Sequence, residues 1–454
     1  MPRALAAALG IAVVSLLLVE PAPSYDPWAW LLWGRELAGG ELSTLDGPAF
    51  KPLPVTVCAL LAPLGTAAPW LWVLLVRVAA LLAAGLAYGL GRRLADGSRV
   101  AGGLAALAVL LCGGFPYYAA TGAEPALVLA LALGGAAAWR EHRFRVALAC
   151  AVGCALLRVE AWPFLLALGL VLWRRRPQDR ALLGALALLV PAAWIVPELV
   201  GSGDLLRSGT RARVPNPGQP ALEPIPGLAA LRAAVELPLW PLWAGVAALL
   251  ALSTTPTRDA RAALAPAAAG AAWIAIVALM AQAGFSGEPR YALPGAALIA
   301  LSGAVGLVHA ARVERVGRTL TKATLAVGVA LVALAVAPRI ADLPALRAQQ
   351  AYQWRLAGDL AAAVRAAGGP DAVLACGRPY VGRLRGPLMA YRMGVAKHRV
   401  EPDAPPRAPG MIFRSALTPS ARPTPDAPAR FAEVARAGAW RVFAACGAGG
   451  YAGA

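Results

Sequence analysis

SYDPWAWLLWGRELAGGELSTLDGPAFKPLP (residues 24–54) lies between two strongly apolar segments. Its notable side chains are two aspartates, one lysine and three tryptophans, namely Asp26, Asp46, Lys51, Trp28, Trp30 and Trp33. A carboxylate and a lysine on a tryptophan-rich segment at a membrane surface suit chemistry on an amphiphilic phosphate ester. We therefore interpret residues 21–54 as an outer loop that begins with an amphipathic helix ending near Leu37.

Composition indicates a membrane protein. The 454 residues are 59% hydrophobic and 15% charged, with a mean hydropathy of +0.62, whereas soluble domains carry about 25% charged residues. Apolar stretches long enough to cross a bilayer recur over residues 1–338, which predicts an all-α polytopic domain of about eleven helices. The expected spans are residues 4–20, 69–91, 99–114, 118–139, 146–157, 161–173, 181–199, 236–254, 262–283, 291–311 and 320–338.

The positive charges indicate topology, not nucleic-acid binding. The net charge is +18, but most arginines lie in short loops between spans, where positive charge sets orientation. With the N-terminus inside, the cytoplasmic loops hold sixteen Lys and Arg residues and the short outer loops hold eight. We expect an uncleaved first span, a cytoplasmic N-terminus and an extracytoplasmic C-terminus. The Ala, Arg, Gly and Pro bias suggests a bacterial plasma membrane protein.

Residues 146–173 contain the weakest part of this topology, because Arg158 and Glu160 interrupt a short apolar stretch. One long span here would turn the three arginines at 174–176 outward. We therefore predict two short helices that meet at a polar turn inside the membrane. Such a turn is tolerated where it lines a protein cavity.

For residues 339–454 we predict a small α/β domain outside the membrane. A helix is expected from Asp342 to Ala367, strands over 372–376, 411–413 and 440–446, and a helix over 428–437. Cys376 and Cys446 each end a strand-like run. In an oxidising compartment they are expected to form a disulfide; the alternative is two free buried thiols.

Two outer residues have both a structural and a functional interpretation. Asp26 precedes a proline, so it suits a helix N-cap, and it equally suits a general base. Lys51 lies between Phe50 and Pro52. It suits a snorkelling interfacial lysine or a point charge that neutralises a lipid phosphate.

Further charged residues lie at the predicted outer ends of later spans. Glu124 suits a helix cap or a contact to a sugar hydroxyl or a cation. Arg158 and Glu160 suit an ion pair or the lining of a polar cavity, because charges at membrane depth are unfavourable. Arg290, next to Tyr291, suits a phosphate grip or a pair with Glu288. Arg77 receives no role beyond a buried or cavity-facing charge.

The loop after Glu198 holds three arginines between glycines and prolines, over residues 201–217. It either covers a bound substrate or extends into solvent. The sequence contains no HExxH, Walker A or GxSxG motif and no Cys/His cluster. No cofactor or metal ligand set is identified, although a divalent cation is compatible with the chemistry.

The order of these short motifs resembles the GT-C superfamily of membrane glycosyltransferases, which includes protein O-mannosyltransferases and aminoarabinose transferases. The likeness covers about residues 1–338. Asp26 matches the acidic residue of the first outer loop, and Lys51-Pro52-Leu53-Pro54 approximates a Lys-Pro-Pro-Leu element. The remaining matches are Glu124, the turn Arg158-Val159-Glu160, and Arg290-Tyr291-Ala292-Leu293-Pro294.

The resemblance implies a transferase that moves a sugar from a polyprenyl-phosphate donor to a glycan, lipid or protein acceptor, with inversion. Asp26 would be the catalytic base, and Lys51 and Arg290 would bind the donor phosphate. The cavity would be completed by Glu124, Arg158, Glu160 and Tyr291. Two other functions stay open: a transporter or flippase of lipid-linked saccharides, and a non-catalytic scaffold for envelope assembly.

Overall fold

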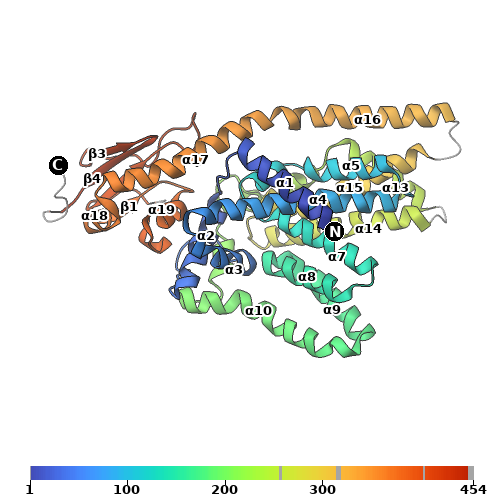
Figure 1. The fold of residues 1–454 in the computed structure, drawn as a ribbon, viewed down its shortest axis with the longest axis horizontal. Coiled ribbons are helices and arrows are strands. Elements are labelled where there is room, and N and C mark those ends of the chain that lie inside the picture. The colour runs from blue at the N-terminus through green and yellow to red at the C-terminus, as the bar shows by residue number, and fades with distance from the viewer. Residues whose placement is uncertain (1, 255–257, 313–317, 402–403, 448–454) are drawn as a thin grey trace.

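The computed structural model describes residues 2–254, 258–312, 318–401 and 404–447. An elongated helical bundle carries a small α/β domain at one end (Figure 1). The helices that precede that domain are α1 Pro2–Leu18, α2 Tyr25–Gly39, α3 Pro52–Leu61, α4 Ala68–Leu94, α5 Arg99–Leu110, α6 Phe115–Ala120, α7 Pro125–Arg140, α8 Phe144–Leu157, α9 Trp162–Arg175, α10 Arg180–Ser202, α11 Arg207–Ala212, α12 Pro226–Val235, α13 Pro241–Ser253, α14 Arg258–Gln282, α15 Pro289–Ala311 and α16 Arg318–Ala341. Short 3-10 turns cover Ala62–Ala67, Val159–Ala161, Pro177–Asp179 and Pro220–Leu222.

Helix α15 is the centre of the bundle and packs against α13, α14 and α5. Small residues let the backbones approach closely, as is common between membrane helices. A Cβ atom added at Gly245 would lie 1.9 Å from the carbonyl oxygen of Gly303, so glycine is required at this crossing. Helices α10 and α16 lie at the periphery, where they expose most of their apolar surface.

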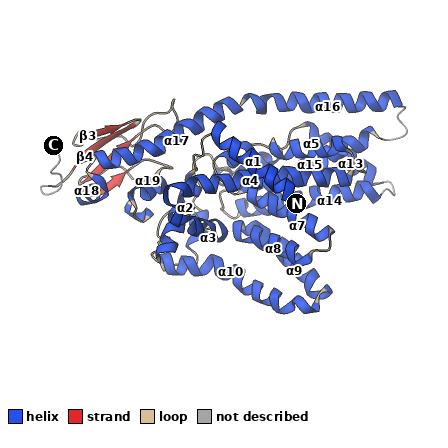
Figure 2. Ribbon diagram, viewed as in Figure 1, coloured by secondary structure: helices blue, strands red, loops and turns tan. Residues whose placement is uncertain are grey.

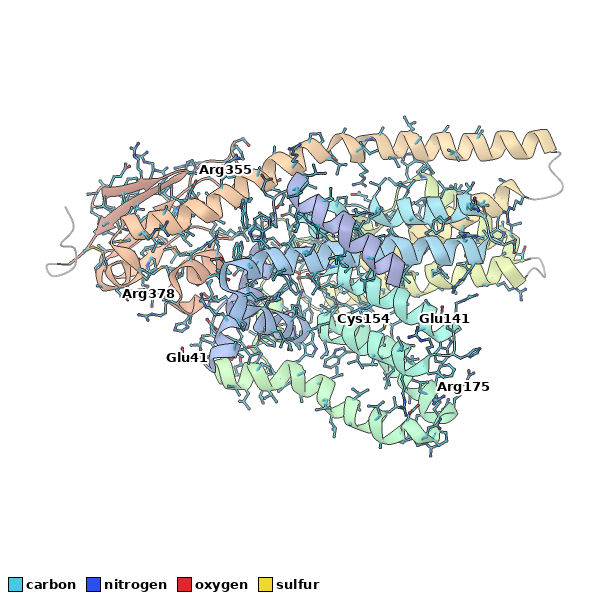
Figure 3. All side chains as sticks on the ribbon, in the orientation of Figure 1. Glu41, Glu141, Cys154, Arg175, Arg355 and Arg378 are labelled. Carbon is cyan, nitrogen blue, oxygen red and sulfur yellow. A yellow bond between two sulfur atoms is a disulfide. The ribbon has the colours of Figure 1, made fainter. Side chains whose placement is uncertain are left out.

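Every predicted span contains a helix, but not every helix is long. Five helical segments are long and apolar enough to cross a membrane, and six shorter apolar helices accompany them among the described residues. The number of eleven crossings therefore stays a prediction. Glu141 and Arg175, in loops predicted to be cytoplasmic, lie at the end of the bundle far from the α/β domain (Figure 3).

The break between α8 and α9 confirms the prediction of two helices in residues 146–173. Arg158 is extended, with φ −146° and ψ 128°, and one 3-10 turn follows it. The alternative of a single long span is wrong. The two charged residues at this break explain it, because their side chains turn toward charged partners instead of lipid.

The tryptophans of α2 correct our expectation of an interfacial amphipathic helix. Trp28, Trp30 and Trp33 are all buried. The ring of Trp30 meets the ring of Trp72 edge-on at 5.6 Å. Helix α2 packs between α3 and α19, so these side chains serve as core residues.

The C-terminal part begins with the predicted long helix, α17 Leu343–Ala366. The elements that follow are α18 Gly369–Cys376, β1 Arg378–Tyr380, α19 Gly386–Met393, the 3-10 turn Lys397–Arg399, β2 Gly410–Arg414, β3 Ala432–Ala437 and β4 Trp440–Ala445. The strand order is β1-β2-β4-β3 (Figure 2). Strands β1 and β2 are parallel, whereas β4 is antiparallel to both of its neighbours.

Two secondary-structure predictions for this domain are wrong. Residues 372–376 lie in helix α18, which starts at Gly369 with Pro370 in its first turn, a favourable position for proline. Residues 428–437 contain β3, not a helix, because a tight turn at Gly438 (φ +51°) pairs Ala437 with Trp440. The strands predicted at 411–413 and 440–446 are present as β2 and β4, and Cys376 forms a disulfide with Cys446.

The α/β domain is fastened to residues 21–54. Arg35 donates a 2.9 Å hydrogen bond to the carbonyl oxygen of Tyr391, whose ring lies 5.2 Å from that of Trp28. The ammonium of Lys397, which is 1% exposed, forms an ion pair with Asp46. The domain is therefore part of the structure around this end of the bundle.

Candidate active site

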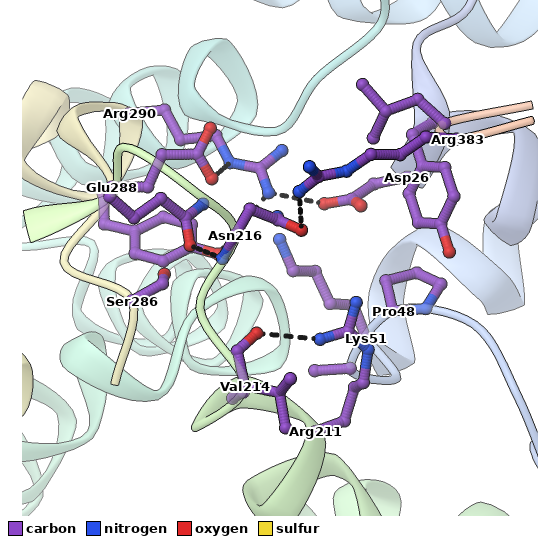
Figure 4. A pocket seen from close by; sticks show the side chains of 16 residues that line it. Asp26, Pro48, Lys51, Arg211, Val214, Asn216, Ser286, Glu288, Arg290 and Arg383 are labelled. Carbon is purple, nitrogen blue, oxygen red and sulfur yellow. Dashed lines mark hydrogen bonds and ion pairs between the residues drawn. The ribbon is translucent and has the colours of Figure 1, made fainter. Parts of the chain in front are cut away.

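Asp26 and Arg290 meet near the α/β domain, with Arg290 Nη2 2.8 Å from Asp26 Oδ2. Asp26 lies in the first turn of α2, whose N-cap is Ser24, so the N-cap interpretation of Asp26 is wrong. Arg290 is the second residue of α15, where Pro289 starts the helix. Two helix starts that are distant in the sequence thus place opposite charges together (Figure 4).

Arg290 has more than one acidic neighbour. Its Nε lies 3.0 Å from Glu288 Oε2, so the expected pair with Glu288 is present beside the pair with Asp26. In this structure the guanidinium is held by two carboxylates. A bound anion would have to compete with them or add to them.

Lys51 belongs to a buried charge network with three other side chains. Its ammonium forms an ion pair with Glu124, and Glu124 Oε1 also accepts from Arg158 Nη1 at 3.1 Å. Arg158 Nε donates to Glu160 Oε2 at 3.0 Å. Each of the four side chains is at most 8% exposed. The snorkelling interpretation of Lys51 is therefore wrong.

Glu124 occupies the N-cap position of α7 but makes no capping hydrogen bond. Its carboxylate faces the basic groups, and its Oε2 has no hydrogen-bond partner among the described residues. Breaking a buried ion pair is strongly destabilising, because one charge is left uncompensated. The network is therefore an arrangement in which all four charges depend on one another.

Tyr291 connects the two groups of charges. Its ring lies 3.7 Å from Arg158 Cζ and 5.2 Å from Arg290 Cζ. Guanidinium groups are attracted to aromatic faces at this range. The carbonyl oxygen of Tyr291 accepts from Trp273 Nε1 at 2.7 Å, which ties the start of α15 to α14.

Two cavities adjoin at this site. A polar cavity of about 110 Å³ is lined by Tyr25, Asp26, Pro48, Ala49, Lys51, Arg211, Ala212, Val214, Asn216, Gln219, Ser286, Glu288, Arg290, Tyr291, Arg383 and Leu384. A mainly apolar cavity of about 210 Å³ is lined by Ala49, Lys51, Leu157, Arg158, Val159, Glu160, Trp162, Trp194, Ile195, Leu205, Leu206, Ser208, Gly209, Ala212, Val277, Met280, Phe285, Gly287 and Tyr291. Lys51 and Tyr291 line both cavities, so the ammonium of Lys51 lies where the polar cavity meets the apolar one.

The predicted site residues therefore gather in one place. Asp26, Lys51, Arg290 and Tyr291 line the polar cavity, and Arg158 and Glu160 line the apolar one. Glu124 lies behind Lys51 as its partner. Arg77 lies elsewhere, where it donates to Ser15 Oγ at 3.2 Å and to the carbonyl oxygens of Glu20 and Ala120 at 3.4 Å.

The sequence analysis assigned no role to Arg383, which the α/β domain places in the polar cavity. Its Nη2 donates to Asn216 Oδ1 at 2.8 Å (Figure 4). Asn216 and Arg211 come from the arginine-rich loop after Glu198, which contains α11 and lines both cavities. Between the two interpretations of that loop, the structure supports a cover over the cavities.

Among the described residues, no three His, Cys, Asp or Glu side chains are grouped so that they would hold a metal ion. The carboxylates of Asp26, Glu124 and Glu160 are paired with arginine and lysine.

Comparison with solved structures defines the class of fold. The chain has the fold of the GT-C membrane glycosyltransferases. The similar structures are those of ArnT from Cupriavidus metallidurans. The apo form has a TM-score of 0.54 at 17% identity, over 98% of this chain and 97% of that one. The form bound to undecaprenyl phosphate has a TM-score of 0.50 at 17% identity, over 98% of both chains. No family model matches the sequence, and no curated protein does.

Proposed function

We propose that this protein is an integral membrane glycosyltransferase that moves a sugar from a polyprenyl-phosphate-linked donor to a cell-envelope acceptor. The junction of the two cavities at Lys51 carries the proposal. A polyprenyl-phosphate sugar has a long apolar tail, an anionic phosphate and a polar sugar in that order. The apolar cavity, the lysine and the polar cavity match those three parts.

Two basic residues are placed to bind the donor phosphate. Lys51 is a point charge at the junction, and Arg290 offers a planar guanidinium on the polar side. Arginine suits bidentate recognition of phosphate. Groups of this kind, fixed in advance, stabilise negative charge as it develops on the leaving polyprenyl phosphate.

Asp26 is our proposed general base. Its carboxylate takes the proton of an acceptor hydroxyl as the hydroxyl oxygen attacks the anomeric carbon. The bond between that carbon and the phosphate oxygen breaks, and the phosphate leaves with the electron pair. A single displacement of this kind inverts the anomeric carbon. When the phosphate engages Arg290, that guanidinium has less charge to share with Asp26, which frees the carboxylate for the proton.

The partners follow from this chemistry. The donor enters from the lipid side between α10, α14 and the α8–α9 turn, whose residues line the apolar cavity. The acceptor is a glycan, a lipid or a protein that reaches the polar cavity from outside the bacterial plasma membrane. We place the N-terminus in the cytoplasm and the α/β domain outside. Nucleic acid has no part in the proposal, and no cofactor is assigned.

A transporter or flippase of lipid-linked saccharides, or a non-catalytic scaffold, would use the same lipid contacts without transfer. Transporters bind near the bilayer midplane, whereas the polar cavity is lined in part by Arg383 of the α/β domain, which lies at one end of the bundle. Activity measurements separate these functions from the enzyme.

The test is sugar transfer from a radiolabelled polyprenyl-phosphate sugar to a delipidated envelope fraction by the purified protein. Asp26→Asn and Lys51→Ala should each lower transfer, Asp26→Asn by roughly 10²–10⁴-fold. The matched controls are Asp371→Asn and Arg347→Ala, which change exposed residues of the C-terminal part. Wild-type transfer by both site variants would remove the proposal.

A further inference from the structure

The segment immediately before Lys51 has no helix or strand of its own. We call residues 43–50 the strap, because they run across the outer end of the bundle as bends and extended chain. Since Lys51 is the first residue beyond the strap, the backbone of the strap decides where its side chain begins. What holds the strap therefore affects the position of the ammonium at the junction of the cavities.

Helix α11 holds the strap through side chain to backbone hydrogen bonds. Arg207 donates to the carbonyl oxygen of Pro48 at 2.8 Å and to that of Gly47 at 2.9 Å. Ser208 Oγ accepts from the amide of Phe50 at 2.7 Å, one residue from Lys51. These three bonds thus fix three of the last four residues of the strap.

Glu198 in turn holds α11. Its carboxylate is 0% exposed near the end of α10, and Oε1 accepts from Ser208 Oγ. Arg207 Nη1 lies 3.4 Å from the same oxygen. Arg207 and Ser208 therefore contact both the strap and Glu198, whereas Arg211, the third residue of α11 that reaches the strap, donates to the carbonyl oxygen of Gly47 at 3.3 Å.

Helix α11 has little else to keep it in place. It is six residues long, and none of them is buried. Glu198 Oε2 has no hydrogen-bond partner among the residues described, although its surroundings exclude water. A buried carboxylate with an unsatisfied oxygen is unfavourable for stability, so its presence suggests a role other than packing.

We propose that Glu198 is a positioning residue for donor binding. Through Ser208 and Arg207 it fixes the strap, and through the strap it fixes Lys51 at the junction of the two cavities. Glu198 itself does not touch the donor. Small displacements of a positioned group reduce its contribution sharply. This inference rests on the proposed function, because it assigns Glu198 a part in binding a polyprenyl phosphate.

The test is a double-mutant cycle read out by binding of undecaprenyl phosphate to the full-length protein in lipid nanodiscs. Glu198→Ala should weaken binding on the order of tenfold. In the Lys51→Ala background the same substitution should have no further effect, since there is no ammonium left to place. Ser208→Ala removes the hydroxyl that joins Glu198 to the amide of Phe50. It should also weaken binding, and it should have no further effect in the Lys51→Ala background. Glu223→Ala, at an exposed glutamate between α11 and α12, is the control and should bind as wild type does.

Two further measurements separate positioning from simple stabilisation. Glu198→Gln keeps an oxygen that accepts from Ser208 and should restore most of the affinity lost in Glu198→Ala. In the transfer assay, Glu198→Ala should raise the donor KM while leaving the acceptor KM unchanged. A purely structural residue would lower the melting temperature without this selectivity.

The outcomes are distinct. Equal weakening by Glu198→Ala with and without Lys51, or a lower melting temperature with unchanged binding, would overturn the positioning role and leave the proposed function intact. Failure of the wild-type protein to bind undecaprenyl phosphate would overturn the proposed function, and the inference with it. If Glu198→Ala does not fold, Ser208→Ala provides the same cycle, and Glu198→Gln should bind nearly as wild type does.

Discussion

Arg290 and Asp26 form an ion pair of 2.8 Å that joins the start of α15 to the start of α2. The pair closes one side of the polar cavity, while Lys51 stands at the junction with the apolar cavity. The opposing charges of the site are therefore paired with one another. In the proposed reaction, groups fixed in this way would need little rearrangement as charge develops.

Substitution of Arg290 should affect both the binding of the donor phosphate and the proposed base, Asp26. Arg290→Ala removes a phosphate ligand and leaves Asp26 without its cation, so we expect kcat to fall by about 10²–10³-fold. Arg290→Lys keeps the positive charge but not the planar guanidinium, so its kcat should lie between those of wild type and Arg290→Ala. Steady-state transfer assays measure both. Equal activity of Arg290→Ala and wild type would exclude this role.

Arg383 should act on the acceptor more than on the donor. Arg383 belongs to the α/β domain and lines the polar cavity but not the apolar one. Its guanidinium donates to Asn216. Loss of a hydrogen bond from a charged group to a substrate oxygen is expected to raise the acceptor KM about tenfold in Arg383→Ala. The donor KM should not change. The exposed Arg378 nearby, as Arg378→Ala, is the control, and a change in donor KM alone would contradict the assignment.

The ion pair of Lys397 with Asp46 should hold the α/β domain on the strap. Asp46→Ala leaves a buried ammonium unpaired; because the Asp46 side chain is 45% exposed, we expect a loss of about 1–3 kcal/mol. The double substitution Asp46→Ala with Lys397→Met removes both charges and should be less destabilising than Asp46→Ala alone. Thermal unfolding and limited proteolysis report the difference. A double variant that is less stable than Asp46→Ala would argue against this contact.

Glu36 predicts a pH dependence of stability outside the membrane. Burial raises the pKa of its carboxyl to about 7, against smaller opposing effects of the Ser43 amide and Arg35. The folded protein therefore holds this proton over a range in which the unfolded chain, with a pKa near 4.5, has lost it. The stabilisation that the protonated Glu36 carboxyl contributes is complete below pH 4.5 and is lost as the pH rises through about 7.

Glu36→Gln imitates the protonated carboxyl and tests this expectation. The melting temperature of the variant should exceed that of wild type above pH 7, and the two should converge toward pH 5. Melting curves across that pH range measure the difference. A gap that is constant with pH would show that Glu36 does not titrate in this way.

Parts of the fold and site could be predicted from sequence because local patterns carry them. Charges within an apolar stretch marked the break at Arg158, since a charge in lipid needs a partner. The same logic placed Asp26, Lys51 and Arg290 at one end of the bundle. In each case the residue type and its distance from an apolar run were sufficient.

Other parts depend on contacts between distant segments. The pattern of Trp28, Trp30 and Trp33 suits a membrane interface as well as a core, and only the packing of α2 against α3, α4 and α19 decides for the core. Arg383 reaches the cavity because its whole domain is fastened to the strap. Residues 428–437 have a helical composition, but pairing with β4 outweighs that local preference.

The most direct test of the account is an experimental structure of the protein with bound undecaprenyl phosphate. We predict a phosphate at the junction of the cavities, in contact with Lys51 Nζ, and an apolar tail that passes Trp162 and Trp194. A phosphate bound away from Lys51, with the apolar cavity filled by protein side chains, would contradict the central claim.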